Sequence, residues 1–470
     1  MTDRREFLWS LAAAGVGAGR QLTAPISAGP KKQVIVAGGG IGGLCCAYEL
    51  VRRGHNVTVL EASGIVGGHV RTVRDGLADG LYFDAGAEHF TKPGYDLYWS
   101  YVKEFQLEYL RDVQRDNRFR SVAGGVYSDA DLSNPAVLKK LGFKQKEIDF
   151  LSQNPWQERE SLYLTKYCSA FPDEYHPFSA GLDDLDKISL TQLLEKEGAS
   201  PAYVEFAGGS GSALHTVWHV AILNKRGVPL SPNEVFRLKG GNSRLPDAFA
   251  ERLGERVKLG CPVTAIRHGD SGVTVSYREY GRNQEISGDY LVCCMSAVML
   301  RQIPITPSLP EQKQWAVANV PYYSSVRPAF QSRTKFWRDQ KSSVNMEFDR
   351  SDLHYVWSTA EDVPTSRGLI IGTGSSGLTS DAALAIFRAK YQGKGDTIEH
   401  ATAVDWSRDP WSMACETTSY RVGELSRFWP ALMEPYKRIH FAGAYCDNLN
   451  WGQEAATRSA NRVAIAIDKA

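Results

Sequence analysis

A short stretch near the N-terminus restricts the fold more than any other part of this chain. Residues 33–37 are apolar and rich in β-branched side chains, which favours a buried strand. Residues 44–53 repeat apolar side chains at helical spacing, and residues 56–61 predict a second strand. Strand, helix and strand follow one another within about 30 residues, an order typical of a parallel βαβ unit. The chain is therefore expected to contain a parallel α/β sheet.

A glycine cluster joins the first strand to the helix and fits the pattern G-x-G-x-x-G. In this pattern the first glycine permits a tight turn, the second lets backbone approach a pyrophosphate, and the third allows close helix–strand packing. The helix N-terminus adds free N–H groups and a positive dipole end. Glu61 ends the second strand, where its carboxylate can accept hydrogen bonds from a ribose diol. The dinucleotide contacts predicted in this unit are Gly38, Gly40, Ile41, Gly42, Gly43, Glu61 and Ala62.

Two further turns extend the cofactor prediction, because the first motif alone fits FAD and NAD equally well and also fits a purely structural turn. A second glycine turn at residues 64–72 carries basic side chains that can reach back to a pyrophosphate. A third turn at residues 84–90 has small residues that let a flat ring approach the backbone. The contacts predicted in these two turns are Gly68, His69, Arg71, Gly86 and Ala87.

Composition bounds the classes of function. The chain has 470 residues, 43% of them hydrophobic, which is enough for two or three domains. The net charge is +1 and no run of basic residues occurs, so nucleic acid is not an expected partner. The eight cysteines show no CxxC or Cys/His spacing, and no metal site is predicted. No stretch is long and apolar enough to predict an integral membrane segment.

The first thirty residues differ from the rest of the chain. Arg4 and Arg5 precede a short apolar stretch at residues 11–19, which resembles a twin-arginine export signal. That route carries folded proteins with their cofactor, and it predicts delivery to the periplasm. The alternative is an ordinary N-terminal tail with a chance pair of arginines.

The three turns together resemble the flavin-containing amine oxidase family, which includes monoamine oxidases, polyamine oxidases and L-amino acid oxidases. Residues 240–246 continue the resemblance, and residues 441–444 and 452–456 look like the family segments that lie along the flavin. The resemblance implies FAD as the cofactor. It adds as cofactor contacts Val263, Cys415, Gly443, Ala444, Gln453, Glu454 and Ala455.

Several positions depart from the family pattern. His69 stands where the family usually has arginine, so that Arg71 is expected to take over a phosphate contact. Ala444 replaces an acid of the C-terminal segment. Arg327 stands where many members have a lysine that holds a water near flavin N5, which leaves both an oxidase and a dehydrogenase open.

The resemblance also predicts the residues around the substrate. Cys415 falls where monoamine oxidases carry the cysteine that bonds covalently to the flavin, and both covalent and non-covalent attachment stay open. Glu416 falls where one tyrosine of the aromatic cage is expected, and Trp451 lies beside the second cage position. Glu416 could pair with a substrate ammonium. Arg327, Glu416 and Trp451 are the predicted catalytic residues.

These observations predict an α/β protein with a Rossmann-like FAD-binding domain and an interleaved α+β substrate-binding domain. The FAD domain is expected at residues 31–95, 236–310 and 405–470, and the substrate domain at 96–235 and 311–404, after an export signal at 1–30. The expected function is oxidation of an amine by hydride transfer to flavin, with molecular oxygen as acceptor. The alternatives are a dehydrogenase or desaturase of the carotenoid-desaturase type, and a non-catalytic escort protein on the same fold. A homodimer stays open.

Overall fold

The computed structural model describes residues 29–113, 116–230, 232, 234–338, 343–449 and 452–470. The twin-arginine segment and Trp451 therefore lie outside the described residues.

The strands predicted around the first glycine turn form the centre of a five-stranded sheet. The strand order is β10-β2-β1-β14-β23, and all neighbours in it run parallel. These strands are β1 (Gln33–Ala37), β2 (Asn56–Leu60), β10 (Val257–Lys258), β14 (Tyr290–Cys293) and β23 (Ile439–Phe441). The βαβ unit at the centre of the sheet supplies β1 and β2, and the other three strands come from widely separated stretches of the sequence.

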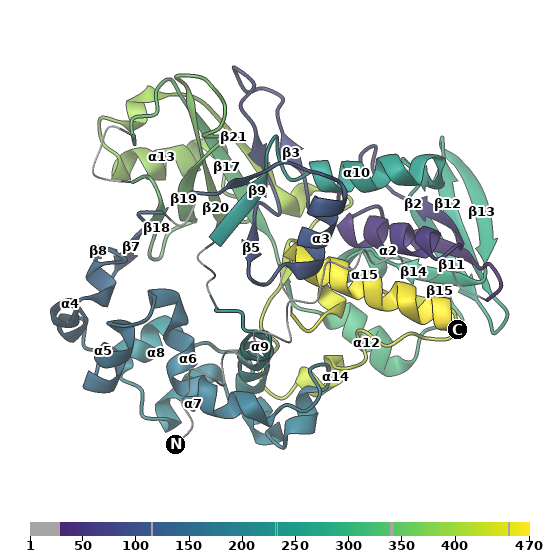
Figure 1. Cartoon of the computed structure of the whole chain (residues 1–470), viewed down its shortest axis with the longest axis horizontal. Coiled ribbons are helices and arrows are strands. Elements are labelled where there is room, and N and C mark those ends of the chain that lie inside the picture. The colour runs from purple at the N-terminus through teal and green to yellow at the C-terminus, as the bar shows by residue number, and fades with distance from the viewer. Residues whose placement is uncertain (1–28, 114–115, 231, 233, 339–342, 450–451) are drawn as a thin grey trace, which may run out of the picture.

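Alternate residues of β1 face opposite sides of this sheet, since side chains of a strand point alternately to its two faces. Val34 and Val36 join a core with helices that pack beside the sheet, whereas Ile35 and Ala37 join the core on the other side. The helices of the first core are α2 (Ile41–Arg52), α3 (Asp96–Glu104), α10 (Arg244–Leu253) and α15 (Gly452–Lys469). Figure 1 shows α2 and α15 side by side, although they lie at opposite ends of the sequence.

A smaller sheet extends the same half of the molecule, in the order β13-β12-β11-β15. Its strands are β11 (Val263–His268), β12 (Val273–Glu279), β13 (Arg282–Gly288) and β15 (Ile305–Thr306). Two helices flank β15 in the chain: α11 (Ala297–Leu300) precedes it and α12 (Glu311–Asn319) follows it. The start of β11 carries Val263 next to the carboxyl ends of β2 and β10, since Cys261 N donates to Glu61 O.

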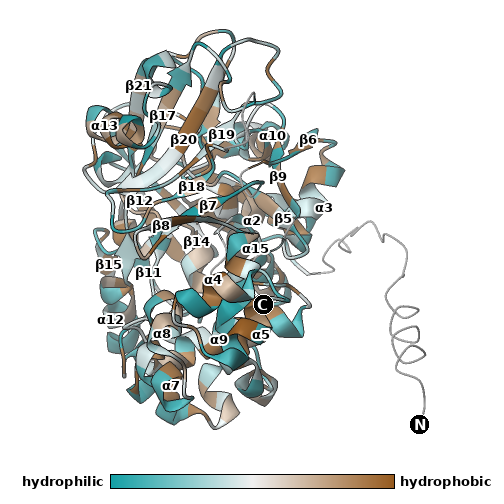
Figure 2. Ribbon diagram, turned by 90° about the vertical axis from the view of Figure 1, so that its left-hand side faces the viewer, coloured by the Kyte–Doolittle hydropathy of each residue, from teal (hydrophilic) through white to brown (hydrophobic). Residues whose placement is uncertain are grey.

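The second half of the molecule is built on a seven-stranded, mainly antiparallel sheet, in the order β21-β17-β20-β19-β18-β7-β8. These strands are β7 (Phe119–Val122), β8 (Gly125–Ser128), β17 (Ser325–Ser332), β18 (Met346–Glu347), β19 (Leu353–Thr359), β20 (Gly368–Ser375) and β21 (Ile398–Asp405). Hydrophobic residues concentrate in its inner strands (Figure 2), and α13 (Ser380–Lys390) covers one face through Ala383 and Phe387.

A group of helices lies below this sheet in Figure 1. In the sequence, most of them come between β8 and β9. The helices are α4 (Pro135–Lys140), α5 (Gln145–Leu151), α6 (Ser161–Leu164), α7 (Leu190–Lys196), α8 (Pro201–Ala207) and α9 (Ala213–Lys225), with α14 (Leu425–Phe428) nearby. Small sheets tie the halves together: β3 (Thr72–Val73) with β4 (Phe83–Asp84), β5 (Phe90–Lys92) with β9 (Glu234–Leu238) and β6 (Tyr109–Arg111), and β16 (Tyr322–Tyr323) with β22 (Glu416–Thr417).

The architecture confirms the predicted fold class, an α/β protein with a Rossmann-like part and an interleaved α+β part. The domain boundaries drawn from the sequence stay predictions. In the part of the chain that the structure describes, no helix is both long enough and apolar enough to cross a bilayer.

Candidate functional site

A cavity of about 680 Å³ lies where the Rossmann-like sheet meets the seven-stranded sheet. Its wall on the Rossmann-like side comes from the ends of β1 and β2, from the turns that follow them, and from residues after β14 and β23. Its other wall comes from β16, β17 and the segment between β21 and β22. The cavity therefore brings together residues of the three glycine turns and of the two C-terminal segments at 441–444 and 452–456.

The first glycine turn forms one end of this wall. Gly38 has a φ of +109°, and a Cβ there would lie 3.1 Å from the backbone of Cys294. A methyl group at Gly43 would overlap the carbonyl oxygen of Gly38. Gly40 and Gly42 line the cavity directly, together with Ile41. The roles predicted for these glycines, a tight turn and close packing, thus have a steric cause in the structure.

Glu61 lies at the end of β2 and lines the cavity beside Ala62. Its Oε2 accepts a hydrogen bond from Gly39 N at 2.6 Å, and its Oε1 accepts one from Ser63 N at 2.8 Å. A Cβ at Gly39 would come within 2.9 Å of the Glu61 side chain, so the bare backbone there allows the contact. Each carboxylate oxygen keeps a second lone pair, with which it can accept a hydrogen bond from a ribose hydroxyl.

The second and third turns pack against each other. Gly67 and Gly68 have φ values of +109° and +59°, a conformation that favours glycine. A side chain at Gly86 would overlap the carbonyl oxygen of His69, to which Ala87 N donates at 3.0 Å. Gly68, His69, Gly86 and Ala87 all line the cavity.

Arg327, on β17, is buried and its guanidinium is already engaged by the protein. Nε donates to Ala85 O at 3.3 Å, and Nη2 donates to Gly86 O at 3.2 Å. Nη1 donates to Gly372 O at 3.4 Å and lies 2.8 Å from Glu88 Oε2. These contacts use most of the five N–H donors of the side chain, and the Glu88 carboxylate balances its charge. Arg327 thus holds the third turn in place while it lines the cavity.

Glu416 is placed by the pairing of β22 with β16, which sets it opposite Tyr323. Tyr323 OH donates to Glu416 Oε2 at 3.2 Å, and both side chains line the cavity. Glu416 keeps exposed surface, although many protein atoms surround its carboxylate. Burial raises the pKa of Glu416 above its ordinary value, and the hydrogen bond from Tyr323 opposes that shift. The neighbouring Cys415 lines the cavity with its Sγ 3.3 Å from Ser325 Oγ.

The remaining predicted residues divide into two groups. Val263, Gly443, Ala444 and Gln453 line the cavity. Gly43, Arg71, Glu454 and Ala455 do not: Arg71 pairs with Asp409, and Glu454 accepts hydrogen bonds from Leu97 N and Tyr98 N at the start of α3. Burial raises the pKa of Glu454 to about 7.

The geometry fits a bound dinucleotide. Bare backbone at Gly40 and Gly68 faces the cavity, with no atom nearer than 3.4 Å to a Cβ built at either position. An acid at one end of the cavity and a helix N-terminus beside it are the groups that a ribose and a pyrophosphate need.

Comparison with known proteins decides the family. The model of the flavin containing amine oxidoreductases matches residues 41–468. The chain belongs to this family. Among curated proteins, it is 25% identical to an L-amino-acid oxidase of Bothrops atrox, over 93% of this chain and 89% of the relative. It is 26% identical to an L-amino-acid oxidase of Demansia vestigiata, over 93% of this chain and 87% of that protein.

Solved structures show the same fold. A cyclohexylamine oxidase from Brevibacterium oxydans matches with a TM-score of 0.77 and 21% identity, over 94% of this chain and 99% of that one. A putrescine oxidase bound to putrescine matches with a TM-score of 0.76 and 20% identity, over 94% of this chain and all of its own (100%). This flavin-containing amine oxidoreductase is therefore an enzyme with FAD as its cofactor, and the predicted family and cofactor are confirmed.

Sequence reasoning missed part of the cavity wall. Tyr322 and Tyr323 of β16, Ser325 of β17 and Met299 of α11 line the cavity but carry no motif. Tyr323 lies next to Glu416 because β16 pairs with β22. No local sequence pattern predicts a strand of two residues. The two adjacent tyrosines at 322 and 323 are the one available signal, because aromatic side chains often line ligand pockets.

Proposed function

We propose that this enzyme oxidises an amine that carries no α-carboxylate. When bound, FAD supplies the chemistry, by accepting a hydride from the substrate carbon that bears the nitrogen. The protein supplies the cavity between the two sheets and a carboxylate, Glu416, that can pair with the incoming ammonium. The hydroxyl of Tyr323 orients this carboxylate.

The occupied guanidinium of Arg327 is the observation that carries this proposal. A substrate carboxylate is best bound by a guanidinium with two parallel N–H groups to offer. The donors of Arg327 point instead to Glu88 and to three backbone carbonyls. The charge near Glu416 thus favours a cation over a zwitterion, although the curated relatives include L-amino-acid oxidases.

Matched pairs of compounds test this preference. Phenethylamine and L-phenylalanine differ only by the α-carboxylate, and so do cadaverine and L-lysine. We expect kcat/KM to be at least about tenfold higher for the amine of each pair, a factor that corresponds to about 1.4 kcal/mol. Equal or higher values for the amino acids would show that a carboxylate site exists and would overturn the proposal.

Glu416→Gln should raise KM for amines and move the pH optimum of kcat down. The variant removes a charge-assisted hydrogen bond of about 1.5–3 kcal/mol, so KM should rise about ten- to hundredfold. A nearby carboxylate also raises the pKa of the bound ammonium, whereas oxidation needs the neutral amine. Pairing needs an ionised Glu416, so in the wild type it should weaken as the pH falls through the raised pKa of this group.

Steady-state kinetics across pH check this prediction, with Glu195→Gln as the control, since Glu195 is an exposed acid on α7. A Glu416→Gln enzyme with the KM and pH profile of the control would place Glu416 outside the substrate pocket.

Molecular oxygen is the electron acceptor that we propose, and Arg327→Lys tests its access. This change keeps a positive charge beside Glu88. It replaces the planar guanidinium, which the protein already binds, with a single ammonium group on a flexible side chain. We expect faster reoxidation of the reduced flavin by oxygen, measured by stopped-flow absorbance. An unchanged reoxidation rate, slow in both proteins, would favour a dehydrogenase that uses another acceptor.

We further propose that the enzyme is exported as a folded protein by the twin-arginine route, on the basis of Arg4 and Arg5 ahead of the apolar residues 11–19. Changing both arginines to lysine should trap the enzyme in the cytoplasm of the producing bacterium, as fractionation and immunoblotting would show. Periplasmic delivery of that variant at the wild-type level would rule the route out.

A further inference from the structure

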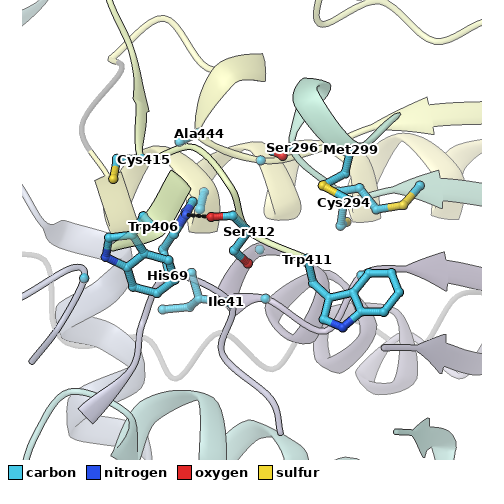
Figure 3. Close-up of a pocket in the computed structure, with 18 of the residues that line it drawn as sticks. Ile41, His69, Cys294, Ser296, Met299, Trp406, Trp411, Ser412, Cys415 and Ala444 are labelled. Atoms are coloured by element: carbon cyan, nitrogen blue, oxygen red, sulfur yellow. Dashed lines mark hydrogen bonds between the residues drawn. The ribbon is translucent and has the colours of Figure 1, made fainter. Parts of the chain in front are cut away.

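One stretch of the cavity wall has no regular secondary structure. Residues 409–413, here called the strap, connect the end of the seven-stranded sheet to β22. Trp411 and Ser412 of the strap line the cavity, and Trp411 keeps 41% of its surface exposed. Figure 3 shows Trp411 on the side of Met299 and Cys294, away from His69. The strap therefore forms a wall of the cofactor cavity that backbone pairing does not fix.

Asp409 gives the strap its shape. Its Oδ1 accepts hydrogen bonds from Trp411 N at 2.9 Å and from Ser412 N at 2.8 Å. A side chain that binds its own backbone two and three residues on stabilises a tight local turn. Its other oxygen, Oδ2, stays available for a contact outside the strap.

That contact comes from the second glycine turn. Arg71 Nη2 lies 2.9 Å from Asp409 Oδ2, and the Arg71 guanidinium stacks 4.8 Å from the ring of Trp406. The side chains of this ion pair are 26% and 12% exposed, so solvent screens it less than a surface pair. The ion pair with Asp409 thus connects Arg71 of the second glycine turn to the strap.

His69 makes the second contact with the strap. Its Nε2 lies 2.9 Å from Ser412 O, as the dashed line in Figure 3 marks. A carbonyl oxygen only accepts hydrogen bonds, so Nε2 must carry the hydrogen. Burial lowers the pKa of His69, although the hydrogen bond to Ser412 O and the nearby Asp409 oppose that shift.

Both basic side chains of the second turn therefore contact the strap, Arg71 through Nη2 and His69 through Nε2. We propose that Arg71 and His69 are positioning residues that latch the strap against the cofactor cavity and thereby set how fast FAD leaves the protein. The sequence instead leads us to expect that Arg71 takes over a phosphate contact, since His69 stands where the family usually has arginine. The latch does not depend on which substrate the enzyme oxidises, because neither contact involves Glu416 or Tyr323.

A double-mutant cycle separates the latch from a phosphate contact. Asp409→Asn keeps an oxygen that accepts from Trp411 N and Ser412 N but loses the charge that Arg71 faces. Arg71→Gln removes the partner charge, and the double variant removes both. All proteins carry Cys415→Ala, so that no thiol at that position can retain the flavin. The readout is the rise in FAD fluorescence after dilution of the holoprotein into buffer without cofactor.

If the latch exists, each single variant should release FAD about tenfold faster, a factor equal to about 1.4 kcal/mol. The double variant should release it no faster than the singles, because the same contact is lost only once. If Arg71 binds phosphate directly, Arg71→Gln should speed release, whereas Asp409→Asn should leave release unchanged or slow it, since the freed guanidinium can then serve the phosphate. That pattern, or unchanged release in both singles, overturns the proposal.

Arg226→Gln is the matched control. Arg226 pairs with Glu174 at 2.7 Å, the two side chains are 29% and 25% exposed, and neither lines the cavity. This variant should release FAD at the wild-type rate. If it also speeds release tenfold, general destabilisation explains the effect and the latch is contradicted.

Discussion

Gly43→Ala is expected to abolish FAD binding and to destabilise the fold. The added methyl group would overlap the carbonyl oxygen of Gly38 and come within 3.2 Å of Cys294 Cβ. The overlapping atom is backbone in the turn between β1 and α2, so no side-chain rotation can relieve it. The cost should therefore exceed the ~1–3 kcal/mol of ordinary overpacking in a core.

Gly64→Ala is the control for this change. Gly64 belongs to the second turn, but no atom lies within 4 Å of a Cβ built on it. Absorbance near ~450 nm, a property of bound flavin, and the thermal midpoint should both stay at the wild-type value in Gly64→Ala. Normal flavin content and stability in Gly43→Ala would contradict the packing of α2 against the turn.

Arg327→Met should cost about 3–5 kcal/mol of unfolding free energy, the range found when one partner of a buried ion pair is removed. The Glu88 carboxylate would lose its guanidinium at 2.8 Å, and the carbonyls of Ala85 and Gly86 would lose their donor. Chemical denaturation of the holoprotein measures this loss. The third turn should loosen with it, and flavin retention should fall.

The double variant Arg327→Met with Glu88→Gln provides the comparison. It removes both charges of the pair, so it should be more stable than Arg327→Met alone. If the double variant loses as much as the sum of two independent changes, the ion pair contributes nothing to the turn. The role of Arg327 would then have to be sought in the reaction rather than in the structure.

Local patterns predicted the parts of the site that lie close together in the chain. The glycine turn, α2 and Glu61 occur within one βαβ unit, where strand and helix periods fix the geometry. Ala444 and Gln453 line the cavity as expected because the resemblance there covers a strand, a turn and a helix start in order.

Long-range contacts escaped prediction for a physical reason. A charged side chain can have several possible partners. Tertiary packing decides which partner it contacts, and no spacing in the sequence encodes that choice. Arg71 could have reached a phosphate but pairs with Asp409, and Glu454 could have faced the flavin but receives the first N–H groups of α3. Arg327 is in the cavity wall as predicted, yet its partner Glu88 could not be read from the sequence.

Anaerobic reduction of the bound flavin shows which class of compound this enzyme oxidises. The purified holoprotein is mixed with cyclohexylamine, phenethylamine, cadaverine, the matching amino acids and simple alcohols, and the flavin absorbance near ~450 nm is followed. We expect rapid bleaching by at least one of the amines, and much slower or no bleaching by the amino acids and alcohols. Bleaching by an alcohol or an amino acid while no amine reduces the flavin would contradict this expectation.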